Sequence, residues 1–167
     1  MSDKKQIVIK YACILFDLVD LNLLGDFFQL ELIALTTPQV IGEITNETQW
    51  QEISKFVDSG HLQIDSEGEF EVVQKIYDEY PGLSIPASSV LELALRKDAI
   101  IYSSDGSLRK ISIKHGFTVR GILWIIDELH TNGALSKGQA VEKLNLYEAI
   151  NQRAPLKEIK KLIEKFK

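Results

Sequence analysis

Asp105 is the residue whose type and position most directly suggest chemistry. It comes three residues after the apolar run Ile100-Ile101-Tyr102, which is typical of a buried parallel strand. In α/β folds, functional side chains gather at the carboxyl ends of such strands, and hard divalent cations prefer carboxylate oxygens. One interpretation of Asp105 is therefore a metal ligand. The other is that Asp105 and Gly106 form a turn in which Asp105 caps the next helix.

A local group of basic residues follows Asp105 in the sequence. Its members are Arg109, Lys110, Lys114 and Arg120, with His115 among them. Beside a metal site these cations would hold an RNA backbone through contacts to phosphate. The alternative is that they form a solvated helix face.

The elements that must position these residues alternate along the chain. Short apolar runs predict strands at 7–9, 32–37, 61–65, 99–103 and 117–119. Helical spacing of apolar residues predicts one or two helices within 13–32, and further helices over 40–56, 70–80, 84–97, 107–114, 121–129, 136–150 and 156–166. This alternation predicts a three-layer α/β/α fold with a mostly parallel sheet. The length of 167 residues predicts a single domain, 1–167, that includes the two C-terminal helices.

Two segments resemble a known family. Ser103-Ser104-Asp105-Gly106-Ser107-Leu108-Arg109-Lys110, followed by Gly116-Phe117-Thr118-Val119-Arg120-Gly121-Ile122-Leu123, is similar to the C-terminal signature of PIN domains. In particular, it is similar to the short bacterial and archaeal PIN proteins akin to VapC-type toxins. Ile7-Val8-Ile9, Thr37–Glu43 and Leu83–Ala99 fall in matching order, so that the resemblance covers essentially the whole chain. It implies a PIN-like fold and a metal-dependent ribonuclease with about four acidic residues at the sheet's carboxyl edge.

Only two of the four acidic positions that the resemblance implies carry an acid in this sequence. Glu43 corresponds to the acid on the helix after the second strand, and Asp105 to the acid after the later strand. The position after the first strand falls on Tyr11, and the position at the start of the helix after Leu83-Ser84 falls on Ala87. Two carboxylates give a charge of −2, enough for at most one divalent ion. Catalytic competence is therefore in question.

Three residues are candidates to replace the missing acids. Asp17 lies six residues beyond Tyr11, and a helix between them would displace it by roughly 9 Å along the axis. Glu92 lies about one turn beyond Ser88 and Ser89, from where its longer side chain would have to reach back. The Ser89 hydroxyl could serve as a secondary ligand, although it carries no charge.

Composition limits the remaining classes of function. The formal net charge of −5 excludes a molecule that binds nucleic acid through overall positive charge. A single cysteine, Cys13, excludes an internal disulfide framework and favours the cytoplasm. No apolar stretch reaches the roughly 18 residues of a membrane-span candidate, so no association with a membrane is expected.

We therefore expect a PIN-like nucleic-acid-binding domain related to metal-dependent ribonucleases, with Tyr11 and Ala87 in place of two acids. The alternative is an active, toxin-like endoribonuclease that uses Mg²⁺ or Mn²⁺ at Glu43 and Asp105, assisted by Asp17 or Glu92. The resemblance further implies an antitoxin-like protein partner and a homodimer.

Overall fold

The core of the fold is a parallel sheet. The structure, a computed structural model, describes the backbone of residues 5–9 and 11–167 and the side chains of residues 14–167. In these residues five strands lie in the order β3-β2-β1-β4-β5, and every neighbouring pair is parallel. The strands are β1 (Lys5–Ile9), β2 (Leu32–Thr36), β3 (Leu62–Ile64), β4 (Ile100–Tyr102) and β5 (Val119–Arg120). Their carboxyl ends therefore meet along one edge, as the sequence predicted.

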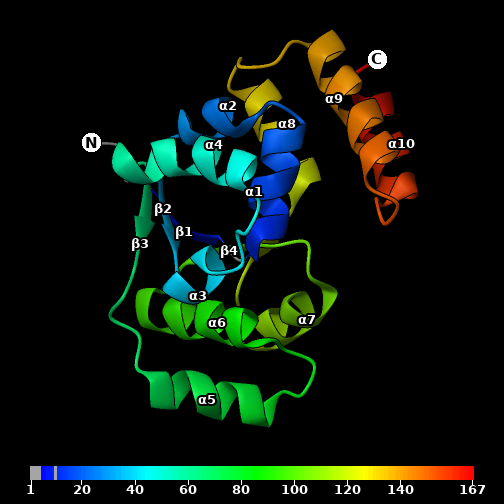
Figure 1. The fold of residues 1–167 in the computed structure, drawn as a ribbon. Helices are drawn as coiled ribbons and strands as arrows, with labels where there is room; N and C mark the ends of the chain where they lie inside the picture. Colours follow the sequence, from blue (N-terminus) through cyan, green and yellow to red (C-terminus); the bar gives the residue numbers. More distant parts are fainter. Residues whose placement is uncertain (1–4, 10) are drawn as a thin grey trace.

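Helices cover both faces of this sheet and confirm the three-layer α/β/α prediction (Figure 1). The layer below the sheet in Figure 1 contains α3 (Pro38–Ile41), α6 (Ile85–Lys97) and α7 (Gly106–Lys114), with α5 (Phe70–Glu79) outside α6. The other side contains α1 (Tyr11–Asp20), α2 (Leu24–Phe28), α4 (Glu47–Asp58) and α8 (Ile122–Thr131), flanked by α9 (Lys137–Ile150) and α10 (Leu156–Lys165). No described helix has the length and apolar character needed to cross a membrane.

Two hydrophobic clusters lie on opposite faces of the sheet. Alternating residues of one strand supply both, because successive side chains of a strand point to opposite faces. Tyr102 of β4 belongs to the cluster that includes α1, α2 and α8, whereas Ile101 belongs to the cluster between the sheet and the helices α6 and α7. Both residues are fully buried, so β4 is fixed from both sides. The loop that carries Asp105 therefore leaves the sheet from a rigid strand.

The prediction of one helix over residues 40–56 is wrong. The structure divides this segment into α3, which already begins at Pro38, and α4, which begins at Glu47. Thr37 caps α3 by accepting a hydrogen bond from the Val40 N–H, and Asn46 caps α4 by accepting one from Gln49. Short polar side chains favour the start of a helix because they accept hydrogen bonds from its first N–H groups. Two such residues here start two separate helices, although the apolar residues continue at helical spacing. Glu43 consequently follows α3 instead of lying on a helix.

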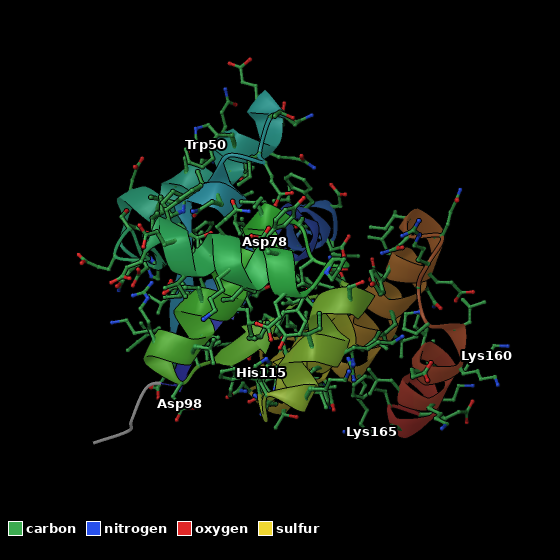
Figure 2. All side chains as sticks on the ribbon, turned by 90° about the horizontal axis from the view of Figure 1, so that it is seen from below. Trp50, Asp78, Asp98, His115, Lys160 and Lys165 are labelled. Carbon is green, nitrogen blue, oxygen red and sulfur yellow. The ribbon has the colours of Figure 1, made fainter. Side chains whose placement is uncertain are left out.

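The C-terminal helices α9 and α10 form a pair at one side of the molecule. Lys143 of α9 donates to the Leu21 carbonyl at 2.7 Å, and Lys165 of α10 forms an ion pair with Asp127 of α8 at 2.9 Å. The Phe166 ring packs edge-on against His130, with 4.8 Å between ring centroids. Seen from below, Lys160 and Lys165 lie on α10 at the margin of the molecule (Figure 2). These contacts hold the α9–α10 connection beside the carboxyl edge of the sheet.

Candidate nucleic-acid interface

The carboxyl edge of the sheet has two parts, which differ in how much space their side chains leave open. We call the part beside β2, β3 and α6 the closed half, and define it by Thr37, Asp65, Ser89, Glu92 and Arg96. We call the pocket beside β4, β5 and the α9–α10 connection the open half. The closed half leaves a space of only about 40 Å³, whereas the open half is a pocket of about 980 Å³.

Hydroxyl groups close the space at the end of β2. Ser89 of α6 donates to the Pro86 carbonyl at 2.6 Å, so its single proton is used there. Thr37 then donates to Ser89 Oγ at 2.7 Å while accepting from the Val40 N–H. Both side chains are buried. Ser89 is thus the α6 residue that faces the end of β2, whereas Ala87 packs in the apolar cluster beneath α6.

An arginine between two carboxylates fills the rest of the closed half. Arg96 binds Glu92 at 2.5 Å and Asp65 at 2.8 Å, and the two carboxylate side chains are only 5% and 8% exposed. Burial raises the pKa of Asp65, but hydrogen bonds from Arg96 and from the Glu67 N–H lower it by more, so that it lies below its usual value. Glu92, the candidate replacement acid, is therefore already paired with a guanidinium.

Gly68 shows how tightly this network is covered. It lies on the β3–α5 loop, and a Cβ atom there would stand 2.7 Å from Glu92 Oε1. Real Cβ contacts are essentially never that short, so a side chain at position 68 would force the loop or the carboxylate to move. The loop thus seals Glu92 from outside.

Glu43 lies outside the open half. Its chain position follows α3, its side chain is partly buried, and it is not among the residues that line the pocket. Tyr11 begins α1, but its side chain lies outside the described residues, as does that of Cys13. The structure therefore does not bring Glu43 and Asp105 together in one described pocket.

Asp105 and Asp17 do line one pocket. Asp105 occupies the N-cap position of α7 but makes no side-chain capping hydrogen bond, and its own N–H donates to Ser103 Oγ at 3.0 Å. Asp17 reaches the pocket from α1. Burial, and secondarily the nearby Asp20 charge, raise the pKa of Asp17 to about 6. Of the candidate replacement acids, Asp17 is the one that lines the same pocket as Asp105.

Three arginines reach the open half from three separate segments. Arg109 comes from α7, Arg120 from the end of β5, and Arg153 from the α9–α10 connection. Lys110 and Lys114, which belong to the same basic group of the sequence as Arg109 and Arg120, do not line the pocket. A helical turn explains this division, because Arg109 and Lys110 on α7 point about 100° apart.

Aromatic side chains form the inner wall of the open half. The Arg120 guanidinium lies 4.0 Å over the Trp124 ring, and Trp124 contacts the buried Tyr102 edge-on at 5.6 Å between ring centroids. Burial raises the pKa of Tyr102 to about 12, although the Arg120 guanidinium opposes this shift, so the phenol stays neutral at pH 7. The sequence did not single out Trp124 for this site, because Arg120 ends a strand and no helical spacing rule pairs it with a residue of the following helix.

A comparison with family models assigns the chain. The model described as PIN domain matches residues 7–167. The chain belongs to the PIN domain family. No curated protein matches it. PIN domains are nuclease-like domains that generally depend on metal and bind nucleic acid. The match over residues 7–167 confirms the family and the fold expected from the sequence.

The described residues of this PIN domain do not fit a two-ion site. Three carboxylates line the open half, those of Asp17, Asp105 and Glu158. Among the side chains of residues 14–167, however, no three His, Cys, Asp or Glu residues come together in a group that could hold a metal ion. Two divalent ions need a shared set of oxygen ligands to balance their charge. At most two of these three carboxylates can therefore meet at one ion.

Proposed function

We propose that this PIN domain binds single-stranded RNA in its open half and that its catalytic competence is reduced or lost. The observation that carries the proposal is the division of the sheet edge. Arginines and an aromatic wall line the spacious part, whereas hydroxyl groups and an arginine-bound glutamate fill the part beside β2. Arginine donates to phosphate oxygens in a planar fork and also stacks on flat rings.

Two arginines of the open half supply contacts for an RNA backbone. Arg109 and Arg153 are both exposed and line the pocket from separate segments of the chain. Such cations release counterions when they meet phosphates, and this makes binding depend on salt. The chain as a whole is acidic, so nucleic acid would be held locally and not by the general surface.

Fluorescence anisotropy of a labelled single-stranded RNA tests the binding. We expect the double variant Arg109→Gln, Arg153→Gln to bind at least tenfold more weakly. Its plot of log affinity against log salt should lose about 1.4 in slope, roughly 0.7 for each phosphate contact. The matched control is Lys110→Gln with Lys114→Gln, which removes the same charge from α7 outside the pocket and should change affinity less than twofold. Equal losses in both double variants would refute binding in the open half.

A cleavage assay tests the catalytic part of the proposal. Purified protein is incubated with the same RNA in Mn²⁺, in Mg²⁺ and in EDTA, with Asp105→Asn in parallel. We expect the protein not to cleave the RNA at this site. Any residual cleavage should therefore persist in EDTA or in Asp105→Asn. Robust cleavage with both sensitivities would replace this proposal with the active enzyme.

The second candidate function is that active enzyme, an endoribonuclease with Mg²⁺ or Mn²⁺ at Asp105, assisted by Asp17. The presence of both acids in the lining of one pocket favours it. Its distinguishing result is that Asp17→Asn and Asp105→Asn each abolish cleavage while Glu92→Gln does not, since Glu92 is bound to Arg96. Glu43→Gln then decides whether Glu43 contributes, because Glu43 lies outside the lining.

The likeness to VapC-type proteins supports three further parts of the proposal: residues 1–167 act as a single cytoplasmic domain, the domain pairs with an antitoxin-like protein, and it forms a homodimer. Light scattering of the purified chain measures its mass in solution. A monomer mass at micromolar concentration would remove the homodimer from the proposal.

A further inference from the structure

The Arg120–Trp124 pair is held in place by the elements around it. Arg120 ends β5 and Trp124 lies in the first turns of α8, so the strand and the helix set their separation. Trp124 rests on Tyr102, and Tyr102 in turn lies 5.9 Å from the Phe27 ring, both of them fully buried. The indole is therefore held from behind by the core while Arg120 and Trp124 both line the pocket.

We propose that this pair is the stacking surface for one unpaired nucleobase, with Arg109 and Arg153 receiving the adjoining phosphates. The inference rests on the proposed RNA binding and deepens it by naming the side chains that receive the base and the phosphates. Every nucleobase offers a flat π surface, and bases stack both on indole rings and on guanidinium planes. The recognition is thus tolerant of sequence but demands an unstacked base.

Several segments of the chain form the walls of the open half. They come from α1, from the β4–α7 and β5–α8 connections, and from the α9–α10 connection, with the buried Tyr147 of α9 among them. A pocket of about 980 Å³ is in the range of sites that enclose one small organic ligand. Such a volume accommodates a nucleotide whose base is unstacked.

Charge alone would not give this pocket its preference. The three arginines share the lining with Asp17, Asp105 and Glu158, so cations and carboxylates are equal in number. A free phosphate would gain little from such a balanced set. Stacking on the Arg120–Trp124 pair must therefore supply most of the selectivity, and it separates a nucleotide from a simple anion.

Fluorescence of Trp124 reports directly on this contact. The chain has two tryptophans, and Trp50→Phe leaves Trp124 as the sole reporter without touching the pocket lining. That variant is titrated with AMP, with ribose 5-phosphate and with inorganic phosphate. We expect AMP to quench the emission and to bind at least fivefold more tightly than ribose 5-phosphate. Equal affinity for AMP and ribose 5-phosphate, or no binding of AMP, would overturn the inference.

RNA binding by Trp124 variants supplies the second arm. Trp124→Leu should weaken single-stranded RNA binding at least fivefold, Trp124→Phe should retain most of it, and Trp50→Phe should leave it unchanged. If the arginine double variant loses RNA and Trp124→Leu does not, stacking is refuted and the proposed function stands. If AMP quenches Trp124 but no RNA binds, the nucleotide site stands and the proposed function fails.

Discussion

The two halves of the sheet edge belong to one fold but differ in how much space they leave for a ligand. In the closed half, Arg96 satisfies Glu92 and Asp65, and hydroxyl groups satisfy one another at the end of β2. In the open half, arginines and carboxylates line a large space without filling it. Polar groups in the closed half therefore fill its space with contacts to one another, whereas those of the open half surround a space large enough for a ligand. Predictions that separate stability from binding test this comparison.

The largest effect is expected for Arg96→Met. The substitution leaves Glu92 buried without its cation, and removing one partner of a buried pair costs about 3 kcal/mol of unfolding free energy. Urea unfolding measures the loss. The double variant Arg96→Met, Glu92→Met removes one of the two stranded carboxylates and leaves Asp65, so it should recover about half of the loss. Single-variant stability within about 0.5 kcal/mol of the parent would show that the closed half is not held by this network.

A smaller effect, on binding alone, is expected for Ser104→Trp. Ser104 is exposed and lines the open half, so an indole would occupy the pocket at little cost to the fold, within about 0.5 kcal/mol. RNA affinity should fall at least tenfold in the anisotropy assay. Gln152→Trp is the control, since Gln152 is exposed beside Arg153 but does not line the pocket. Unchanged affinity in Ser104→Trp would place the RNA elsewhere.

The packing of the closed half gives the third prediction. Gly68→Ala should lower stability by about 1 kcal/mol, because the new methyl group meets Glu92 Oε1. Gly25→Ala in α2 is the matched control, where no atom lies within 4 Å of the added Cβ. An alanine in a helix favours folding by about 0.5–1 kcal/mol, so thermal denaturation should shift in opposite directions. A parallel shift would contradict the tight cover over Glu92.

Much of the fold followed from the sequence because strand and helix periods alternate plainly. The helix boundaries around Glu43 did not, since two short capping residues outweighed a continuous apolar pattern. The start of β5 was also placed two residues early: Phe117 instead donates to the Ser112 carbonyl, and β5 begins at Val119.

The candidate site was harder to predict than the fold. Asp105, Arg109 and Arg120 could be found because they follow two adjacent strands in sequence. Arg153 and Tyr147 could not, because only tertiary packing of α9 and α10 brings them to the pocket. Glu92 gave a signal that was passed over: Arg96 follows it by four residues, the spacing at which opposite charges pair along a helix.

The smallest effect concerns the pH dependence of stability through Asp17. A carboxyl whose pKa rises from 3.8 to about 6 on folding binds more protons in the folded state. The contribution of Asp17 to stability therefore falls as pH rises from about 4 to about 6 and stays level above that. Asp17→Asn lacks this loss, so it should gain up to about 1 kcal/mol at pH 7 and almost nothing at pH 4, the solvent having screened part of the effect.

Unfolding curves at several pH values measure that difference. Asp20→Asn is the control, since the Asp20 charge is the second cause of the raised pKa. It should give a smaller gain over the same pH range. A gain for Asp17→Asn that is constant from pH 4 to pH 7 would show that its carboxyl is not desolvated in the pocket.

Mn²⁺ binding tests the central claim most directly, that the carboxyl edge of this PIN domain no longer holds a pair of metal ions. Electron paramagnetic resonance counts free Mn²⁺ during titration of the whole chain, with Asp105→Asn and Asp17→Asn as companions. We predict at most one weakly held ion per chain, with a dissociation constant on the order of 1 mM, as expected for two carboxylates. Two ions bound per chain at micromolar concentration, and lost in both variants, would contradict the account.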